Sequence, residues 1–180
     1  MKAGIHPQGE CPLFVGTERP VLARAPTPHI RIKNDRGLIV SSIWTVTPNL
    51  ESIHKQNENT AVRSLGIEFT EVGDDFLRAR MPVDSRTVQP FGILHGGSSV
   101  LLAETLGSVA ANHCMKKNNT VGVGLEINAN HIRSVSSGWV YGTARPLHIG
   151  GSTQVWEIRI ETEDGKLSCI SRITMAIIDR

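Results

Sequence analysis

The feature that most restricts the fold of this chain is one long helical pattern placed between two groups of strand-like segments. The helix is predicted to start at His95-Gly96-Gly97 and to run to about Cys114, with an apolar side at helical spacing. The strand-like segments are Gly66–Val72 and Phe76–Val83 before it, and about Thr120–Arg133, Gly138–His148, Thr153–Thr162 and Leu167–Ile178 after it. This order predicts an α+β fold, with an antiparallel sheet of about six strands and one principal helix, rather than alternating β-α units.

Local signals support the strands and predict how the sheet is buried. Trp156, Ile158 and Ile160 alternate with charged residues, which indicates a strand with one buried face. The pair Asp164-Gly165 then favours a tight hairpin turn. Because one helix cannot cover both faces and the edges of such a sheet, we expect the chain to form a homo-oligomer.

The chain divides into an extension and one folded domain. Residues 1–42 carry five prolines and no sustained hydrophobic period, so we expect a poorly ordered N-terminal extension. Residues 43–180 are expected to form the domain, which begins with a short helix from Thr47 or Pro48 to about Glu58, capped by Thr47.

Charge and cysteine usage exclude several classes of protein. A formal net charge of +2 without a basic face argues against a nucleic-acid partner. No apolar run reaches the length of a membrane span, and the N-terminus lacks the apolar core of a secretory signal. Cys11, Cys114 and Cys169 are widely spaced, which fits reduced thiols in the cytoplasm better than disulfides or a zinc site. We expect neither a metal nor a cofactor.

Glu104 is the most informative single residue of the long helix. The residues that share its side of the helix are small or apolar: Gly97, Val100, Leu101, Gly107, Ser108 and Ala111. A carboxylate in such surroundings is costly to bury unless another group pairs with it or a reaction uses it. The alternative is that Glu104 faces solvent, as most helix glutamates do.

Gly96 lies where the chain enters the helix, so its N–H has no helical acceptor and sits at the positive end of the helix dipole. Such a donor can polarise a carbonyl and stabilise an oxyanion. Gly96 and Glu104 are two turns apart, a rise of about 12 Å, so a site that uses both on one small carbonyl would be shared between two subunits. Ser108 lies one turn after Glu104 on the same face.

Three stretches resemble one known family: MPVDSRTVQPFGILHGGSSVLLAETLGSVA (Met81–Ala110), VGLEINANHIRS (Val123–Ser134) and RPLHIGGSTQVWEI (Arg145–Ile158). They are similar to the hotdog-fold thioesterases of the 4-hydroxybenzoyl-CoA and phenylacetate type. The likeness extends to the 1,4-dihydroxy-2-naphthoyl-CoA hydrolases of menaquinone biosynthesis and the proofreading thioesterases of the enterobactin pathway. It covers about residues 43–180 and implies a hotdog fold, in which the sheet wraps around the long helix, and a tetramer of paired dimers.

The resemblance implies the roles of individual residues. Glu104 matches the catalytic acidic residue, Gly96 the backbone donor to the thioester carbonyl, Gln89 and His95 its polar helpers, and Ser108 the hydroxyl near the attacking water. Further residues are implied to bind substrate or CoA, which is itself part of the substrate: Gly124, His131, Ile132, Arg133, Ser134, His148, Ile149, Gly150, Gly151, Ser152 and Thr153. No residue is predicted to bind a metal.

The function expected from these observations is hydrolysis of acyl-CoA thioesters, with an aromatic acyl group such as 1,4-dihydroxy-2-naphthoyl or benzoyl. Glu104 would act either as a general base on water or as a nucleophile, and the sequence leaves both open. Alternatives are proofreading of aryl carrier-protein thioesters, clearance of many acyl-CoAs, the hydratase chemistry of other hotdog proteins, and acyl-CoA binding without catalysis.

Overall fold

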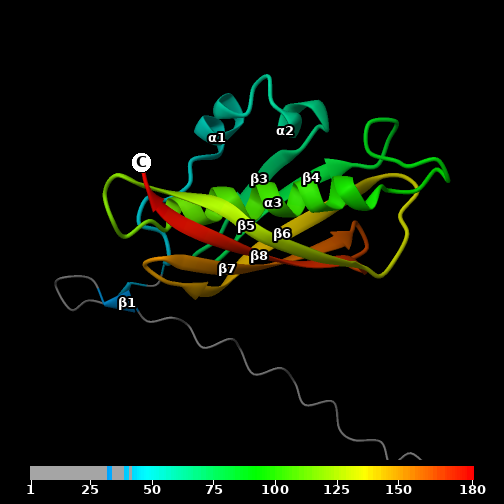
Figure 1. Cartoon of the computed structure of the whole chain (residues 1–180). Coiled ribbons are helices and arrows are strands. Elements are labelled where there is room, and N and C mark those ends of the chain that lie inside the picture. The colour runs from blue at the N-terminus through cyan, green and yellow to red at the C-terminus, as the bar shows by residue number, and fades with distance from the viewer. Residues whose placement is uncertain (1–31, 34–38, 41) are drawn as a thin grey trace, which may run out of the picture.

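The structure, a computed structural model, describes residues 32–33, 39–40 and 42–180 (Figure 1). A six-stranded, wholly antiparallel sheet has the order β3-β4-β6-β7-β8-β5, and one long helix, α3, packs against it. The elements of this body are α1 (Leu50–Gln56), α2 (Ala61–Ser64), β3 (Glu68–Val72), β4 (Leu77–Pro82), α3 (Gly96–His113), β5 (Thr120–His131), β6 (Trp139–Ile149), β7 (Thr153–Thr162) and β8 (Leu167–Asp179). This arrangement confirms the expected α+β hotdog fold.

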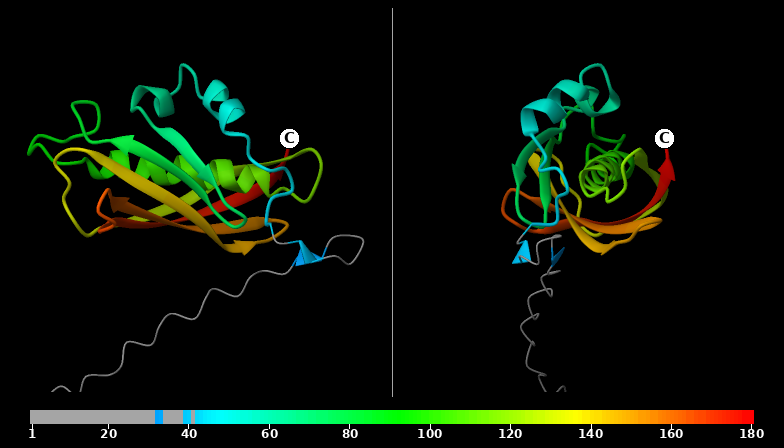
Figure 2. Two further views of the ribbon diagram at one scale, coloured as in Figure 1. Left: turned by 180° about the vertical axis from the view of Figure 1, so that it is seen from behind. Right: turned by 90° about the vertical axis from the view of Figure 1, so that its left-hand side faces the viewer.

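The concave face of the sheet holds the core. The right-hand view of Figure 2 looks nearly along α3 and shows the sheet curving around it. Trp156, Ile158 and Ile160 of β7 are fully buried, as their alternation predicts, and Leu102 and Leu106 supply the buried side of α3. Burial of such large apolar side chains is the main force that holds one helix in the curve of the sheet.

Two glycines set the distance between α3 and the sheet. A Cβ atom at Gly107 of α3 would lie 2.4 Å from Cγ2 of Ile173, and one at Gly142 of β6 would lie 2.5 Å from Cδ1 of Leu106. At both positions a methyl group would therefore force the neighbouring side chain to shift, because the helix and the strands approach each other closely.

The region before β3 differs in detail from the prediction. Helix α1 begins at Leu50, and its N-cap is Asn49, whose side chain accepts a hydrogen bond of 2.8 Å from the backbone N–H of Ser52. The prediction that Thr47 caps the helix is therefore wrong. The N-cap residue must lie next to the first helical residue, because only there can its side chain reach the free N–H groups of the first turn. Helix α2 has only four residues, too few for a periodic pattern to predict.

The other boundaries agree to within a few residues. Strand β7 has the expected bounds, and the turn after it contains Gly165 at φ +75°, as a tight hairpin requires. Two short strands, β1 (Ile32–Lys33) and β2 (Ile39–Val40), form an antiparallel pair within the predicted N-terminal extension. The rest of that extension, up to residue 41, lies outside the described residues.

The sheet leaves one long edge strand open. Strand β5 pairs with β8 along its whole length, and none of the described strands lies on its other side. Its apolar side chains Val123 and Leu125 are 40% and 65% exposed, and Ile132 just after it is 56% exposed. In the described part of the chain, no helix is long and apolar enough to cross a membrane.

The glycine contact predicts a measurable effect on stability. Gly107→Ala is expected to lower the free energy of unfolding by about 1 to 2 kcal/mol in urea denaturation followed by tryptophan fluorescence. Overpacking against Ile173 costs about 1 to 3 kcal/mol, and the better helix propensity of alanine returns at most about 1 kcal/mol. Gly151→Ala is the control, because a Cβ there meets nothing within 4 Å. Equal stability of the two variants would contradict this account of the packing.

Candidate active site

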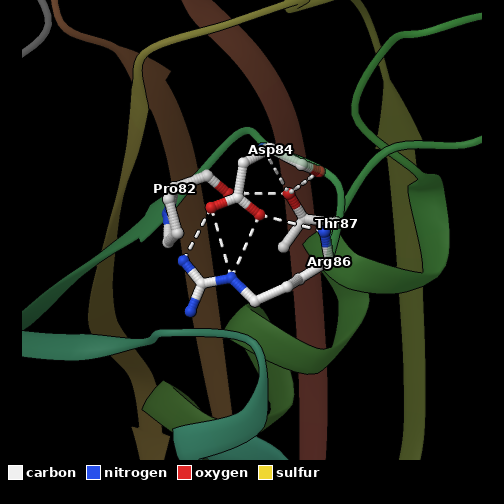
Figure 3. Close-up of polar contacts among 4 residues, drawn as sticks. All are labelled: Pro82, Asp84, Arg86 and Thr87. Atoms are coloured by element: carbon white, nitrogen blue, oxygen red, sulfur yellow. Dashed lines mark hydrogen bonds and ion pairs between the residues drawn. The ribbon is translucent and has the colours of Figure 1, made fainter.

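The loop from β4 to α3 is organised by a buried hydroxyl. Figure 3 shows Thr87, whose Oγ1 donates to the carbonyl of Pro82 at 2.7 Å and accepts from the N–H of Asp84 at 3.1 Å. The carbonyl of Thr87 also accepts from the N–H of His95 at 2.8 Å. One buried threonine therefore links the end of β4, the loop and the start of α3. The sequence alone does not point to Thr87, because a single threonine in a loop carries no pattern.

An ion pair supports the same loop from outside. Arg86 donates to both carboxylate oxygens of Asp84, and its Nη2 lies 2.6 Å from Oδ2 (Figure 3). These bonds hold the pKa of Asp84 below its usual value and raise that of Arg86. The guanidinium also lies over Gly66, where a Cβ would be 2.7 Å from Nη1. The loop is thus held against the turn before β3.

Gln89 stands at the start of a tight turn in this loop. Its N–H donates to the carbonyl of Ile93, and its carbonyl accepts from the N–H of Gly92, which has φ +74°. The side-chain Oε1 accepts from the N–H of Phe91 at 2.6 Å. Because that contact occupies the oxygen, the Nε2 group is the part of Gln89 left to donate to a ligand.

His95 caps α3 with its ring. Nδ1 accepts from the N–H of Gly97 at 2.8 Å, so in the neutral ring the proton lies on Nε2. Gly96 is the first residue of the helix, and none of the hydrogen bonds within the described residues uses its N–H. The ring of His131, at the end of β5, lies close by, since a Cβ on Gly96 would be 2.8 Å from its Nε2.

A pocket of about 330 Å³ surrounds this helix start. It is lined by Gln89, Ile93, Leu94, Gly96, Ser99, His131, Ile132, Arg133, Ser134 and Ser168. The structure thus brings together two of the expected catalytic residues and the expected CoA contacts at the end of β5. Ile93, Leu94 and Ser168 were not expected there, because only the fold brings the loop and β8 beside β5. Ser99 was not expected either, although it lies about one helical turn after Gly96 on α3.

Glu104 lies farther along α3, against the other end of β5. It is half-buried, and a Cβ on Gly124 would be 2.4 Å from its Oε1, so the carboxylate lies directly on the strand backbone. Ser108 donates from Oγ to the same oxygen at 3.3 Å. The carboxylate is therefore neither fully solvated nor neutralised by a cation: none of the salt bridges among the described residues includes it.

The remaining expected CoA contacts, His148 to Thr153, lie at the opposite end of the domain. This segment joins β6 to β7, and Ser152 accepts a hydrogen bond from the N–H of Ile177 near the end of β8. Nζ of Lys116, just after α3, donates to the carbonyl of Ile149 at 3.4 Å. Within one chain this segment is therefore near the C-terminal end of α3 and away from the pocket at Gly96.

The site contains the groups for acid, base and hydrogen-bond chemistry. A carboxylate, a helix-terminal N–H and an amide donor lie on or beside α3, and no cluster of three or more metal-ligating side chains occurs in the described ranges. Such a set can activate a water molecule or attack a carbonyl, and it can stabilise the oxyanion that forms.

Comparison with known proteins identifies the family. Residues 91–169 match the family model described as the thioesterase superfamily. The 1,4-dihydroxy-2-naphthoyl-CoA hydrolase of Escherichia coli is 53% identical over 136 residues, which are 76% of this chain and 99% of that protein. The proofreading thioesterase EntH of Cronobacter turicensis is 49% identical over 136 residues, 76% of this chain and 98% of that protein.

A solved structure extends the likeness to three dimensions. The crystal structure of a thioesterase from Haemophilus influenzae superposes with a TM-score of 0.74 at 50% identity, over 76% of this chain and 95% of that chain. Sequence and fold agree, and the chain belongs to the thioesterase superfamily, with the hotdog fold of its relatives.

Proposed function

We propose that this protein hydrolyses aromatic acyl-CoA thioesters to the free acid and CoA, with Glu104 as its catalytic carboxylate. The observation that carries the proposal is the placement of this carboxylate, half-buried against the bare backbone of Gly124 with Ser108 on one oxygen. None of the salt bridges among the described residues includes Glu104, so its carboxylate is available to react. The chain also belongs to a family of thioesterases.

The reaction requires a nucleophile at the thioester carbonyl carbon. As a general base, Glu104 takes a proton from water while the oxygen attacks, and the C–S bond then breaks to release the CoA thiolate, which is protonated. As a nucleophile, its carboxylate attacks the carbonyl carbon, the C–S bond breaks to release the CoA thiolate, which is protonated, and water then hydrolyses the mixed anhydride to the free acid and the Glu104 carboxylate. The N–H of Gly96 at the positive end of α3 stabilises the oxyanion in either case. Gln89 adds a side-chain N–H, and the Nε2–H of His95 a third donor.

The active unit is proposed to be at least a dimer, paired through β5. Gly124 at one end of this strand touches Glu104, and His131 at the other end touches Gly96. Antiparallel pairing of two β5 strands places the Gly124 end of one beside the His131 end of its partner. Glu104 of one subunit then meets the Gly96 pocket of the other, which resolves their separation of about 12 Å along one helix.

The same pairing gives the loop from His148 to Thr153 a role. The loop lies near the C-terminal end of α3. Antiparallel pairing therefore brings the loop of one subunit toward the Gly96 pocket of the other subunit. Arg133 and the loop glycines Gly150 and Gly151 can then meet phosphate or pantetheine groups of one CoA. A tetramer built from two such dimers is the proposed assembly, and CoA enters only as part of the substrate.

The proposed acyl group is 1,4-dihydroxy-2-naphthoyl, which would place the reaction in menaquinone biosynthesis. Support comes from the E. coli relative with that named activity, at 53% identity. The Cronobacter relative, at 49%, supports a second candidate, proofreading of aryl thioesters on a carrier protein. We propose a cytoplasmic location, which the free, buried thiols of Cys114 and Cys169 support.

Replacement of the carboxylate tests the catalytic role. Glu104→Gln is expected to lower kcat for benzoyl-CoA by about 100-fold or more, because the amide can neither accept a proton nor attack the carbonyl. Release of free thiol measures the rate. Glu157→Gln is the matched control, since Glu157 is half-buried on the sheet face that points away from α3. Near wild-type turnover in Glu104→Gln would contradict the catalytic role of Glu104.

Charges on the open edge strand test the shared site. Val123→Lys combined with Leu125→Lys is expected to shift sedimentation from dimer or larger to monomer, because two buried like charges would face each other across the pair. The activity per chain should fall as the protein dissociates into monomers. Val46→Lys, at a side chain that is 66% exposed outside β5, is the control. A fully active monomer at assay concentration would contradict the shared site.

A substrate panel tests the acyl preference. We expect kcat/KM to be higher for naphthoyl-, benzoyl- and phenylacetyl-CoA than for straight-chain acyl-CoAs, with moderate promiscuity, because an apolar pocket discriminates by only about 1 to 3 kcal/mol per methylene. The panel also includes an aryl carrier-protein thioester. A higher kcat/KM for this substrate than for the acyl-CoAs would favour proofreading. Preference for long straight chains over every aromatic substrate would overturn the proposed acyl class, and hydration of crotonyl-CoA would indicate hydratase chemistry.

A further inference from the structure

At its N-terminal end, β5 presents almost no side chains to α3. Gly122 and Gly124 face the helix, and a Cβ at Gly122 would be 2.7 Å from Cε of Met115. Strands β4, β6, β7 and β8 hold α3 through buried apolar side chains, but this end of β5 has none to offer. Another interaction must hold the helix at a fixed distance from the glycine backbone.

The side chain of Asn112 supplies that interaction. Its Oδ1 accepts from the N–H of Gly122 at 3.0 Å, and its Nδ2 donates to the carbonyl of Gly122 at 3.0 Å. The amide thus exchanges two hydrogen bonds with one residue, as a neighbouring strand residue would. Its second amide proton goes to the carbonyl of Ser108 at 2.9 Å. Among the described residues, the two bonds to Gly122 are the only hydrogen bonds between α3 and β5.

These bonds lie next to the proposed catalytic carboxylate. Gly122 is two residues before Gly124, whose backbone Glu104 touches, and Ser108 is the residue whose hydroxyl contacts Glu104. Asn112 therefore fixes both surfaces against which the carboxylate rests: the strand backbone on one side and the helix turn with Ser108 on the other. If α3 and this end of β5 moved apart, Glu104 would keep its place on α3 but lose its fixed distance from β5.

We propose that Asn112 is a positioning residue for thioester hydrolysis, which acts by holding α3 to β5 so that Glu104 stays aligned with the substrate carbonyl. The inference rests on the proposed role of Glu104. Small displacements of a reacting group lower the rate of the chemical step strongly, while substrate binding through the distant CoA contacts is little affected. The effect should therefore appear in kcat and not in KM.

The first test compares Asn112→Leu, which keeps the approximate size and removes all three bonds, with Asn118→Ala, an asparagine of the following loop for which the structure shows no side-chain hydrogen bond. With benzoyl-CoA, Asn112→Leu is expected to lower kcat by about 10- to 100-fold, with KM changed by less than about threefold, and Asn118→Ala should leave both unchanged. Hydrogen exchange should show lost protection at the Gly122 amide. A rise in KM with unchanged kcat would instead indicate direct contact with the acyl group and overturn the proposal.

The second test separates this inference from the role of Glu104 itself. In a double-mutant cycle, Asn112→Leu is expected to have little further effect in the Glu104→Gln background, because it acts through that carboxylate. An undiminished loss there would overturn the positioning role. Failure of the proposed function is seen separately, as full activity of the single variant Glu104→Gln. Sedimentation should show the wild-type mass for Asn112→Leu, and dissociation that accounts for the lost activity would also overturn the proposal.

Discussion

The burial of one helix in the concave face of one curved sheet is the constraint on which the rest of this structure depends. The helix runs along β5 for 18 residues, so Gly96 at its start and Glu104 in its middle meet different parts of the strand, and the site is divided between them. Apolar packing fixes α3 on the central strands, whereas glycines let it approach β5 closely enough for a carboxylate to rest on the backbone. Stability and chemistry therefore use different faces of the same helix.

The order and type of the long elements could be predicted from the sequence because each carries its own periodicity. Trp156, Ile158 and Ile160 alternate over a strand with one buried face, and α3 repeats its apolar residues at helical spacing. Glu104 stood out for the same reason: it is a charged residue within a small and apolar pattern, and the structure places it half-buried on β5.

The features that could not be predicted depend on contacts between distant segments. Asn112 binds Gly122 across a loop, and Thr87 acts through bonds to the end of β4 and the start of α3. Neither residue belongs to a repeated pattern, so its partner is known only from the fold. The segment from His148 to Thr153 was expected among the CoA contacts, yet one chain places it far from the Gly96 pocket, because a linear motif does not say which end of the domain a hairpin occupies.

The strand order also determines when the domain can be completed during synthesis. Among the described strands, β5 pairs only with β8, while β6 and β7 lie between them in sequence. A nascent chain that has reached Ile149 therefore carries β5 with neither edge paired, and α3 with its apolar side uncovered by β7 and β8. Because these contacts join residues about 50 positions apart, ribosome-bound intermediates expose apolar surface until β8 has emerged. The protein thus depends on β8 to leave the aggregation-prone state.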